Sequence, residues 1–495
     1  MRQSLFPTLL CGASALLLLA RGFSPAPVAA QEAPADLEAR HGLTPELAAE
    51  IDALAPTMEA VVTEALGSRA AYQRLVRLCA EAPGRLAGSA QATKGVEWAK
   101  DELESLPFDK VWLEEMEVPH WERGAPEVCT ITGPEALAGE AFNVLALGGS
   151  IGTPEGGVRG PVLRVTSFEE LAERADEARG AIVFFDASFD FSNRSMFAEY
   201  GNTGKFRRSG PSEAGKAGAI ACVIRSLASV IDDNPHTGTM QYDERAPKVP
   251  AAALSTVDAD RLAGLCTAGT VELSLTMNCQ WFEPAIGHNV IGDYTGSEFP
   301  DEIVIVGGHL DSWDVAQGAH DDGAGCCHAI EVVRTLSALG IRPKRTIRVV
   351  LYANEENGLR GARDYVARHV EDMPNHVFGL ESDSGGFTPR GFTTNAGDEG
   401  YAILERIISH LEEESADKLW RGGNGGADVG QMAPYGVPVA GYRPDDERYF
   451  AYHHTPADTI EAVNERELNL GAAVISALVY AVADLPTRLP RNLPN

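Results

Sequence analysis

Three patterns of hydrophobic and polar positions follow one another along the chain. The first, from about residue 46 to 105, repeats apolar positions at helical spacing, and an alternating run at 111–118 then predicts a strand. The second consists of short apolar runs separated by Gly and Pro turns, which predicts short strands at 162–165, 181–185 and 219–224. The third alternates strand-like runs (302–306, 346–353, 376–380) with helical runs (325–339, 358–370, 401–413).

The third pattern determines the expected fold class. Strands that alternate with helices predict an α/β fold, here a mixed, largely parallel sheet sandwiched by helices. We assign residues 48–124 and 286–486 to this domain. Residues 125–285 interrupt it and are expected to form an inserted, β-rich domain.

The N-terminal segment is typical of an export signal. Arg2 supplies a positive charge, residues 9–20 are largely apolar, and small side chains at Val28-Ala29-Ala30 suit cleavage by a signal peptidase. We therefore predict a signal peptide over residues 1–30 and export to a periplasm or to the medium. Residues 31–47, rich in Ala, Pro and Glu, are expected to be flexible or propeptide-like.

Composition excludes several classes of partner. The 495 residues include 71 acidic and 41 basic side chains, a formal net charge of -30. A chain this acidic repels phosphate backbones and anionic lipid surfaces, so neither nucleic acid nor a membrane is an expected partner. Seven of the eight cysteines follow the signal peptide, no C-x-x-C occurs, and the sequence leaves disulfide pairing open. We expect the vicinal pair Cys326-Cys327 to be buried packing.

The candidate chemistry lies where the predicted strands end. His309 and Asp311 follow the first strand of the third pattern, Glu355 and Glu356 follow the second, and Asp383 follows the third. In an open α/β sheet these ends face one crevice. Carboxylates gathered there would repel one another, and divalent cations would remove that cost. Mixed His and carboxylate ligands suit zinc in particular.

Five ordered motifs identify a family resemblance. They are Gly-Gly-His-Leu-Asp-Ser (307–312), Asp-Asp-Gly-Ala-Gly (321–325), Asn-Glu-Glu-Asn-Gly-Leu-Arg-Gly-Ala (354–362), Glu-Ser-Asp (381–383) and His-Thr-Pro-Ala-Asp-Thr (454–459). Together they resemble the co-catalytic di-zinc exopeptidases, the family of the bacterial leucyl aminopeptidases. The segment 308–314, the inserted domain and the adjacent His453-His454 resemble its carboxypeptidase Q branch. The resemblance implies a zinc exopeptidase fold with a protease-associated-like inserted domain, and the branch suggests a homodimer.

The resemblance also implies a role for each motif residue. His309 and Asp383 would bind one zinc, Glu356 and His454 would bind a second, and Asp321 would bridge the two. Glu355 would be the general base for a hydroxide held by both metals, and Asp311 would orient His309. A cis peptide is expected between Asp321 and Asp322. Because His453 and His454 are adjacent, either could be the histidine ligand. The position of the following Thr in the family motif favours His454.

The resemblance implies an exported two-zinc exopeptidase that hydrolyses dipeptides or small peptides, as a metallocarboxypeptidase or dipeptidase does. A broad-specificity aminopeptidase has the same metal set and remains the alternative. Asp428, after the Gly-rich run 422–426, is a candidate substrate-binding residue; an acidic group facing the site would favour capture of an amine, and Arg or Lys would favour capture of a carboxylate. A glutaminyl cyclase-like enzyme and a non-catalytic binding protein are remote alternatives, because the two-metal set and Glu355 are all retained.

Overall fold

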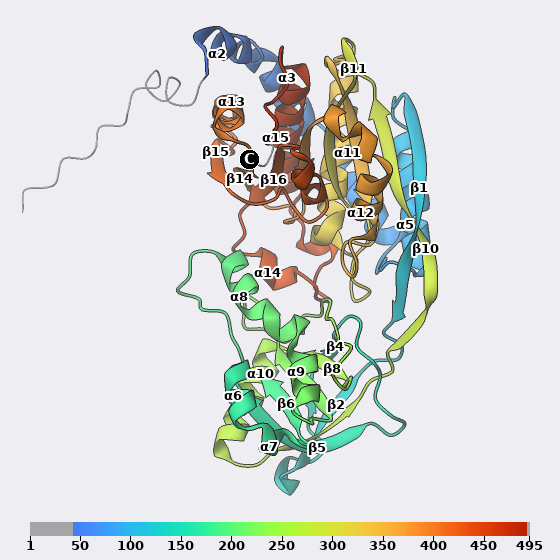
Figure 1. The fold of residues 1–495 in the computed structure, drawn as a ribbon, viewed down its shortest axis with the longest axis vertical. Coiled ribbons are helices and arrows are strands. Elements are labelled where there is room, and N and C mark those ends of the chain that lie inside the picture. The colour runs from blue at the N-terminus through green and yellow to red at the C-terminus, as the bar shows by residue number, and fades with distance from the viewer. Residues whose placement is uncertain (1–42, 493–495) are drawn as a thin grey trace, which may run out of the picture.

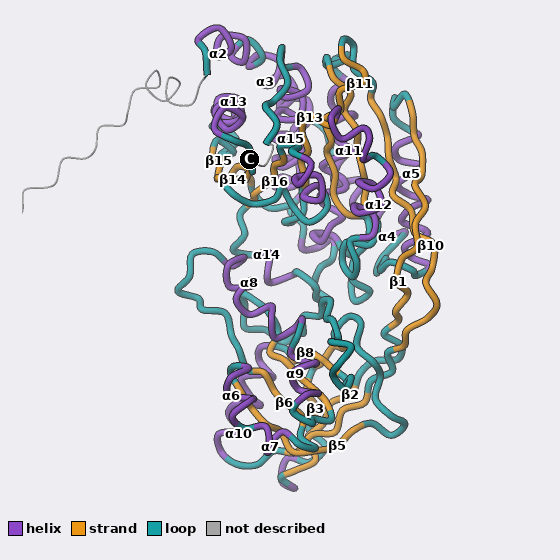
Figure 2. Tube along the Cα trace, in the orientation of Figure 1, coloured by secondary structure: helices purple, strands orange, loops and turns teal. Residues whose placement is uncertain are grey.

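The computed structural model describes residues 43–492, so the predicted signal peptide and most of segment 31–47 lie outside the described residues. The molecule has two lobes, each built on an eight-stranded sheet (Figures 1 and 2). The long antiparallel strands β1 (Lys110–Glu122) and β10 (Gln280–Tyr294) run from one lobe toward the other. Four helices precede them: α2 (Pro45–Asp52), α3 (Ala55–Gly67), α4 (Ala70–Glu81) and α5 (Ala90–Glu104).

The upper sheet has the strand order β1-β10-β12-β11-β13-β16-β14-β15. Its four central strands are parallel: β12 (Arg345–Tyr352), β11 (Phe299–His309), β13 (His376–Glu381) and β16 (Val439–Pro444). The edge strands β14 (Pro389–Thr394) and β15 (Lys418–Arg421) complete it. Parallel strands buried on both faces require continuous apolar runs, and the three predicted strands of the third pattern correspond to β11, β12 and β13.

Helices cover both faces of this sheet, as predicted. Alternate residues of β11 point in opposite directions: Val304 packs with α3, α11 (Ala324–Ala338) and α15 (Glu465–Asp484), whereas Ile305 packs with α12 (Arg360–Arg368). The remaining helices of this lobe are α13 (Asp398–Ile408) and the short α14 (Tyr449–Tyr452). Short 3₁₀ helices occur at Val370–Asn375, Ser409–Leu411, Val429–Tyr435 and Ile460–Ala462.

Helix α15 is long and apolar enough to cross a membrane by length and composition, but 83% of its most apolar window is buried inside the protein. It is the central helix of the upper core, where it packs against α3 and α11. The vicinal Cys326 and Cys327 are fully buried in α11, as expected. None of the seven cysteines among residues 43–492 forms a disulfide.

All strands of the lower sheet come from the segment between β1 and β10. Their order is β3-β2-β9-β5-β6-β7-β8-β4, and β5 to β8 are parallel. The strands are β2 (Val128–Gly133), β3 (Ala141–Phe142), β4 (Val144–Ala146), β5 (Val158–Val165), β6 (Ile182–Phe185), β7 (Ala221–Arg225), β8 (Ala251–Leu254) and β9 (Glu272–Thr276). The helices are α6 (Phe168–Glu173), α7 (Ala175–Ala178), α8 (Met196–Arg208), α9 (Gly210–Lys216) and α10 (Thr256–Ala268), with a 3₁₀ turn at Glu135–Leu137.

Candidate metal centre

Three adjacent parallel strands bring the predicted site residues to one edge of the upper sheet. His309 is the last residue of β11, Glu355 and Glu356 follow β12, and Asp383 follows β13. Because β12, β11 and β13 are neighbours, residues that are far apart in sequence meet at their carboxyl ends. The edge is therefore a crevice lined by imidazole and carboxylate groups.

Asp321 lies at the centre of the cluster. It belongs to an irregular helical turn, Ala319–Gly323, between β11 and α11. Its Oδ1 lies 3.1 Å from His309 Nε2, and its Oδ2 lies 3.2 Å from His454 Nε2. Each carboxylate oxygen thus faces a different imidazole, the arrangement that a bridging ligand needs. The Asp321-Asp322 peptide bond is cis, as the resemblance implies.

One further carboxylate lies beside each imidazole. Asp383 Oδ1 is 3.6 Å from His309 Nε2, and Glu356 Oε2 is 3.1 Å from His454 Nε2. The structure thus brings together His309, Asp321 and Asp383 on one side and Asp321, Glu356 and His454 on the other. These are the two ligand sets implied by the resemblance.

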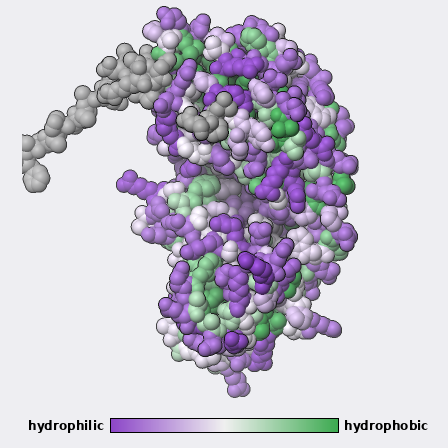
Figure 3. All heavy atoms as spheres, in the orientation of Figure 1, coloured by the Kyte–Doolittle hydropathy of each residue, from purple (hydrophilic) through white to green (hydrophobic). Residues whose placement is uncertain are grey.

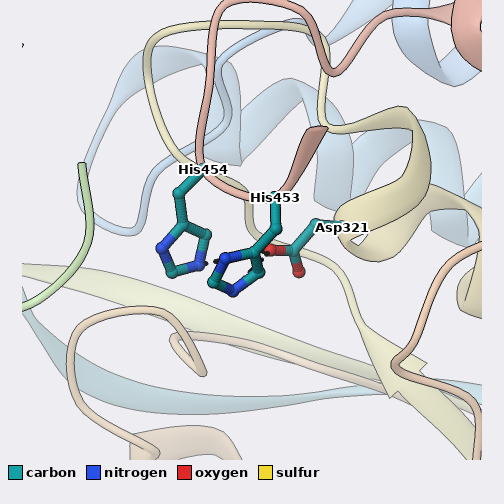
Figure 4. Close-up of side chains that lie close together, drawn as sticks. All are labelled: Asp321, His453 and His454. Atoms are coloured by element: carbon teal, nitrogen blue, oxygen red, sulfur yellow. Dashed lines mark ion pairs between the residues drawn. The ribbon is translucent and has the colours of Figure 1, made fainter. Parts of the chain in front are cut away.

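The two adjacent histidines differ in their neighbours. They follow α14 and stack on each other with ring centroids 3.5 Å apart, and both point toward Asp321 (Figure 4). His453 Nε2 is 3.7 Å from Asp321 Oδ2, farther than His454 Nε2 at 3.2 Å. Only His454 also contacts Glu356. The geometry therefore favours His454 as the second imidazole of the pair.

Asp311 contacts His309 through its backbone and the loop after β12 through its side chain. The Nδ1 atom of His309 is 3.0 Å from the backbone carbonyl oxygen of Asp311 and 3.7 Å from its carboxylate. The carboxylate instead accepts hydrogen bonds from the backbone N–H groups of Glu355, at 2.9 Å, and Glu356, at 3.3 Å. Asp311 therefore fixes the loop after β12 as well as the imidazole.

Burial makes this concentration of carboxylates costly. It raises the pKa of Glu355 well above its ordinary value and that of Glu356 to about 7, and nearby carboxylates add to both shifts. Although burial also opposes ionisation of Asp321, its close contacts with the imidazoles of His309 and His454 hold its pKa well below the usual range. Positive charge at this position therefore stabilises the cluster.

The donor set fits divalent cations. Oδ2 of Asp321 and Oε1 of Glu356 are buried and have no hydrogen-bond partner among residues 43–492. Two groups, Asp321 with His453 and His454, and His309 with Asp321 and Asp383, have ligand atoms within 4.8 Å of one another. Imidazole nitrogen mixed with carboxylate oxygen is a donor set typical of zinc.

The site opens into a cavity of about 750 Å³ between the lobes. Its wall includes His309, Asp321, Glu355, Glu356, Asp383 and His454 from the upper lobe, and Tyr200, Arg207 and Met240 from the lower lobe. The space-filling view shows a hollow between the lobes on a largely hydrophilic face (Figure 3). A cavity of this size accommodates a small ligand rather than a folded chain.

Asp428 does not line this cavity. It is 1% exposed, and its backbone N–H, with that of Val429, donates to Glu381. Burial and the neighbouring Glu381 raise the pKa of the Asp428 carboxyl well above its ordinary value. The structure therefore gives Asp428 no direct path to a ligand in the cavity.

The residues that the lower lobe contributes to the site belong to none of the five motifs. Arg207, on α8, and Thr237 contact His454: the Arg207 guanidinium lies 3.4 Å from His454 Nδ1, and Thr237 N–H donates to the carbonyl oxygen of His454. No motif surrounds these residues, and the only sequence signal is a pair of adjacent arginines, Arg207 and Arg208, in a segment with predicted strands.

Comparisons with known proteins agree with this arrangement. The model of peptidase family M28 matches residues 289–479. Human carboxypeptidase Q is 36% identical over 451 residues, which cover 90% of this chain and 93% of the relative. The mouse carboxypeptidase Q is 36% identical over 422 residues, 85% of this chain and 87% of the relative.

Solved structures show the same fold. The crystal structure of a peptidase M28 precursor from Shewanella amazonensis has a TM-score of 0.86 and 34% identity, and the match covers 90% of this chain and all of that one (100%). A zinc aminopeptidase from Bacillus subtilis has a TM-score of 0.61 and 21% identity, and the match covers 86% of this chain and 98% of that one. The likeness to the first structure extends across both lobes.

Proposed function

The chain belongs to peptidase family M28, and from that premise we propose that it is an exported, zinc-dependent exopeptidase acting on dipeptides or small peptides. The proposed specificity is that of a metallocarboxypeptidase or dipeptidase. The observation that carries the proposal is Asp321, whose two carboxylate oxygens face His309 and His454 on the wall of a small cavity. Export rests on the N-terminal pattern at residues 1–30.

We propose two zinc ions per chain. His309 and Asp383 would hold one, Glu356 and His454 would hold the other, and Asp321 would serve both. When bound, zinc polarises a scissile carbonyl and lowers the pKa of water, which favours hydrolysis. Oδ2 of Asp321 and Oε1 of Glu356, which lack a hydrogen-bond partner within residues 43–492, support this ligand set.

Glu355 is the proposed general base. It lines the cavity, lies beside Glu356 without being assigned to either metal, and is held through its backbone N–H by Asp311. A general base works best when its pKa is near the operating pH. Burial raises the pKa of Glu355 in that direction. It would accept a proton from the attacking water and deliver it to the leaving amine.

The lower lobe is proposed to act as a wall that limits substrate length. Residues of α8 and of the segment 239–242 line the cavity together with the proposed metal ligands. A substrate must fit a volume of about 750 Å³, which suits two or three residues. We assign this role to the inserted segment 125–285, which we propose is a protease-associated-like domain.

Hydrolysis of a peptide panel by the purified protein tests the proposal. The panel contains free dipeptides, amino-acid amides and N-blocked peptides, and each is measured with and without a chelator. Cleavage of free dipeptides that is lost on chelation supports the proposal. Cleavage restricted to amides and to longer peptides with a free amine would instead establish the aminopeptidase alternative. Binding of two zinc ions without cleavage of any peptide would refute the proposed activity.

A further inference from the structure

Arg207 lies where the two lobes meet. It occupies the last turn of α8, is 4% exposed, and lines the same cavity as His309 and Glu355. Its guanidinium donates to the hydroxyl of Tyr200 and to the carbonyl oxygen of Thr237, and approaches His454 Nδ1 at 3.4 Å. Only the imidazole ring of His454 separates it from the carboxylates of the proposed metal centre.

Within the described part of the chain, the positive charge of Arg207 has no acidic partner. None of the three groups that it contacts carries a negative charge, and its Nε has no hydrogen-bond partner among residues 43–492. A buried cation is normally paired with a carboxylate. Four of the five other buried arginines follow that rule: Arg74 with Glu331, Arg225 with Asp186, Arg345 with Glu302 and Arg348 with Asp293. The fifth, Arg85, instead donates to three backbone carbonyl oxygens and does not line the cavity. The charge of Arg207 is therefore available to an anion that enters the cavity.

The contact with His454 cannot satisfy Arg207 once His454 is a metal ligand. A neutral histidine that binds a cation through Nε2 carries its proton on Nδ1. An Nδ1–H group cannot accept a hydrogen bond from a guanidinium. The proposed metal site therefore leaves the five N–H donors of Arg207 with two acceptors among residues 43–492, the Tyr200 hydroxyl and the Thr237 carbonyl oxygen.

The backbone reserves space for this guanidinium. Gly238 has a φ of +131°, and a Cβ atom there would lie 2.3 Å from Arg207 Nη1 and 2.7 Å from His454 Nδ1. Only a glycine allows the lower lobe to approach both side chains so closely. The backbone at Gly238 therefore fits closely against both Arg207 and His454.

We propose that Arg207 determines specificity by binding the C-terminal carboxylate of the substrate; this rests on the proposed function. In a dipeptide the carboxylate follows the scissile bond by a single residue, about 3.5 Å of chain. A guanidinium one imidazole ring away from the proposed metal ligands suits that spacing. Arginine binds carboxylates through two parallel hydrogen bonds. The same cation repels a free amine, so substrates whose scissile bond is the last one are selected.

The test compares free-acid dipeptides with their C-terminal amides. Arg207→Met is expected to lower kcat/KM for the free acid about 10- to 100-fold, mainly through KM, because a charge-assisted pair is lost. The amide should be cleaved nearly as well as by the wild type. Arg207→Lys should keep an intermediate preference for the acid. Lys205→Met, on the same helix but outside the cavity, removes an equal charge and should change neither substrate.

A binding measurement separates recognition from catalysis. Calorimetric titration of the Glu355→Gln protein with an uncleaved dipeptide and its amide should show tighter binding of the acid, and the added Arg207→Met change should abolish the difference. Zinc content and thermal unfolding are measured for each variant. Equal losses for acid and amide, together with loss of zinc, would overturn the proposal by showing that Arg207 merely supports His454. A wild-type enzyme that cleaves dipeptides and their amides equally would also overturn it, while leaving the proposed peptidase activity intact.

Discussion

The carboxylate of Asp311 accepts a 2.9 Å hydrogen bond from the backbone N–H of Glu355. The same carboxylate holds the N–H of Glu356, so one side chain fixes both the proposed base and a proposed ligand. Mutation of a residue that hydrogen-bonds to a metal ligand, without binding the metal itself, typically lowers metal affinity or activity about 10- to 100-fold.

We therefore expect Asp311→Asn to lower kcat about 10- to 100-fold. An amide has one oxygen, so it accepts only one of the two N–H bonds and turns its NH₂ toward the other. Steady-state kinetics together with zinc analysis check this expectation. A kcat within twofold of the wild type would show that the loop after β12 holds its position without Asp311.

This relationship also shows where sequence reasoning reached its limit. The motif predicts that Asp311 belongs to the site, because it follows a buried strand and His309. Which atoms it contacts depends on how the β12 loop folds over β11, and no pattern of hydrophobic positions encodes that. Its contact with His309 Nδ1 is made by the backbone carbonyl oxygen.

The strands themselves were predictable for a physical reason. Strands β11 and β12 are buried on both faces, so their apolar runs are continuous and end where polar chemistry begins. Arg207 has no comparable signal. It meets His454 across 247 residues of sequence only because the strands β1 and β10 carry the lower lobe against the upper one. A contact of that range leaves no local trace in the sequence.

Glu355 and Glu356 are adjacent but should respond differently to the same substitution. Glu355→Gln removes the proposed base, and we expect kcat to fall about 10²- to 10⁴-fold with zinc content unchanged. Glu356→Gln weakens a proposed ligand, so zinc content should fall as well. Metal analysis by mass spectrometry beside kinetics distinguishes the two. The exposed Glu371→Gln is the control for loss of a carboxylate. Loss of zinc from Glu355→Gln would mean that the base assignment is wrong.

The two stacked histidines make a matched pair of variants. His454 contacts both Asp321 and Glu356, whereas His453 approaches Asp321 alone at 3.7 Å. We expect His454→Asn to lose about one zinc ion per chain and most activity, because a ligand is removed. His453→Asn should keep its zinc. The reverse result in a zinc titration would move the ligand assignment by one residue.

Gly238→Ala tests the close approach of the lower lobe. The added Cβ would clash with both Arg207 and His454. We therefore expect kcat/KM to fall at least about tenfold more than in a variant that has only the backbone strain. Gly139→Ala supplies the reference, because Gly139 also has a positive φ, +90°, with nothing within 4 Å. Both variants should lose about 1–2 kcal/mol of unfolding free energy to an unfavourable φ. Equal activity in the two variants would contradict the proposed contact.

The buried imidazole of His376 makes the free energy of unfolding depend on pH. It lies at the opposite end of β13 from the metal centre, where Tyr365 donates to Nε2 and Nδ1 donates to the carbonyl oxygen of Asp372. Burial lowers the pKa of His376 from 6.5 to about 4. The ring is therefore neutral in the folded protein at pH values where the unfolded chain binds a proton.

The direction of the pH dependence follows from the difference between the pKa of His376 in the folded protein and in the unfolded chain. The contribution of His376 is fully present above pH 6.5 and is lost progressively as the pH falls toward 4, because protons then favour the unfolded chain. Between pH 8 and pH 5 the loss is about 2 kcal/mol.

His376→Gln removes the titration, so its free energy of unfolding should fall by about 2 kcal/mol less than that of the wild type over this range. Urea unfolding at both pH values, with a chelator present throughout, measures the difference. His288→Gln, at a partly exposed position on β10, is the control for loss of an imidazole. If His376→Gln and the wild type have the same pH dependence, the imidazole of His376 in the wild type becomes protonated within the folded protein.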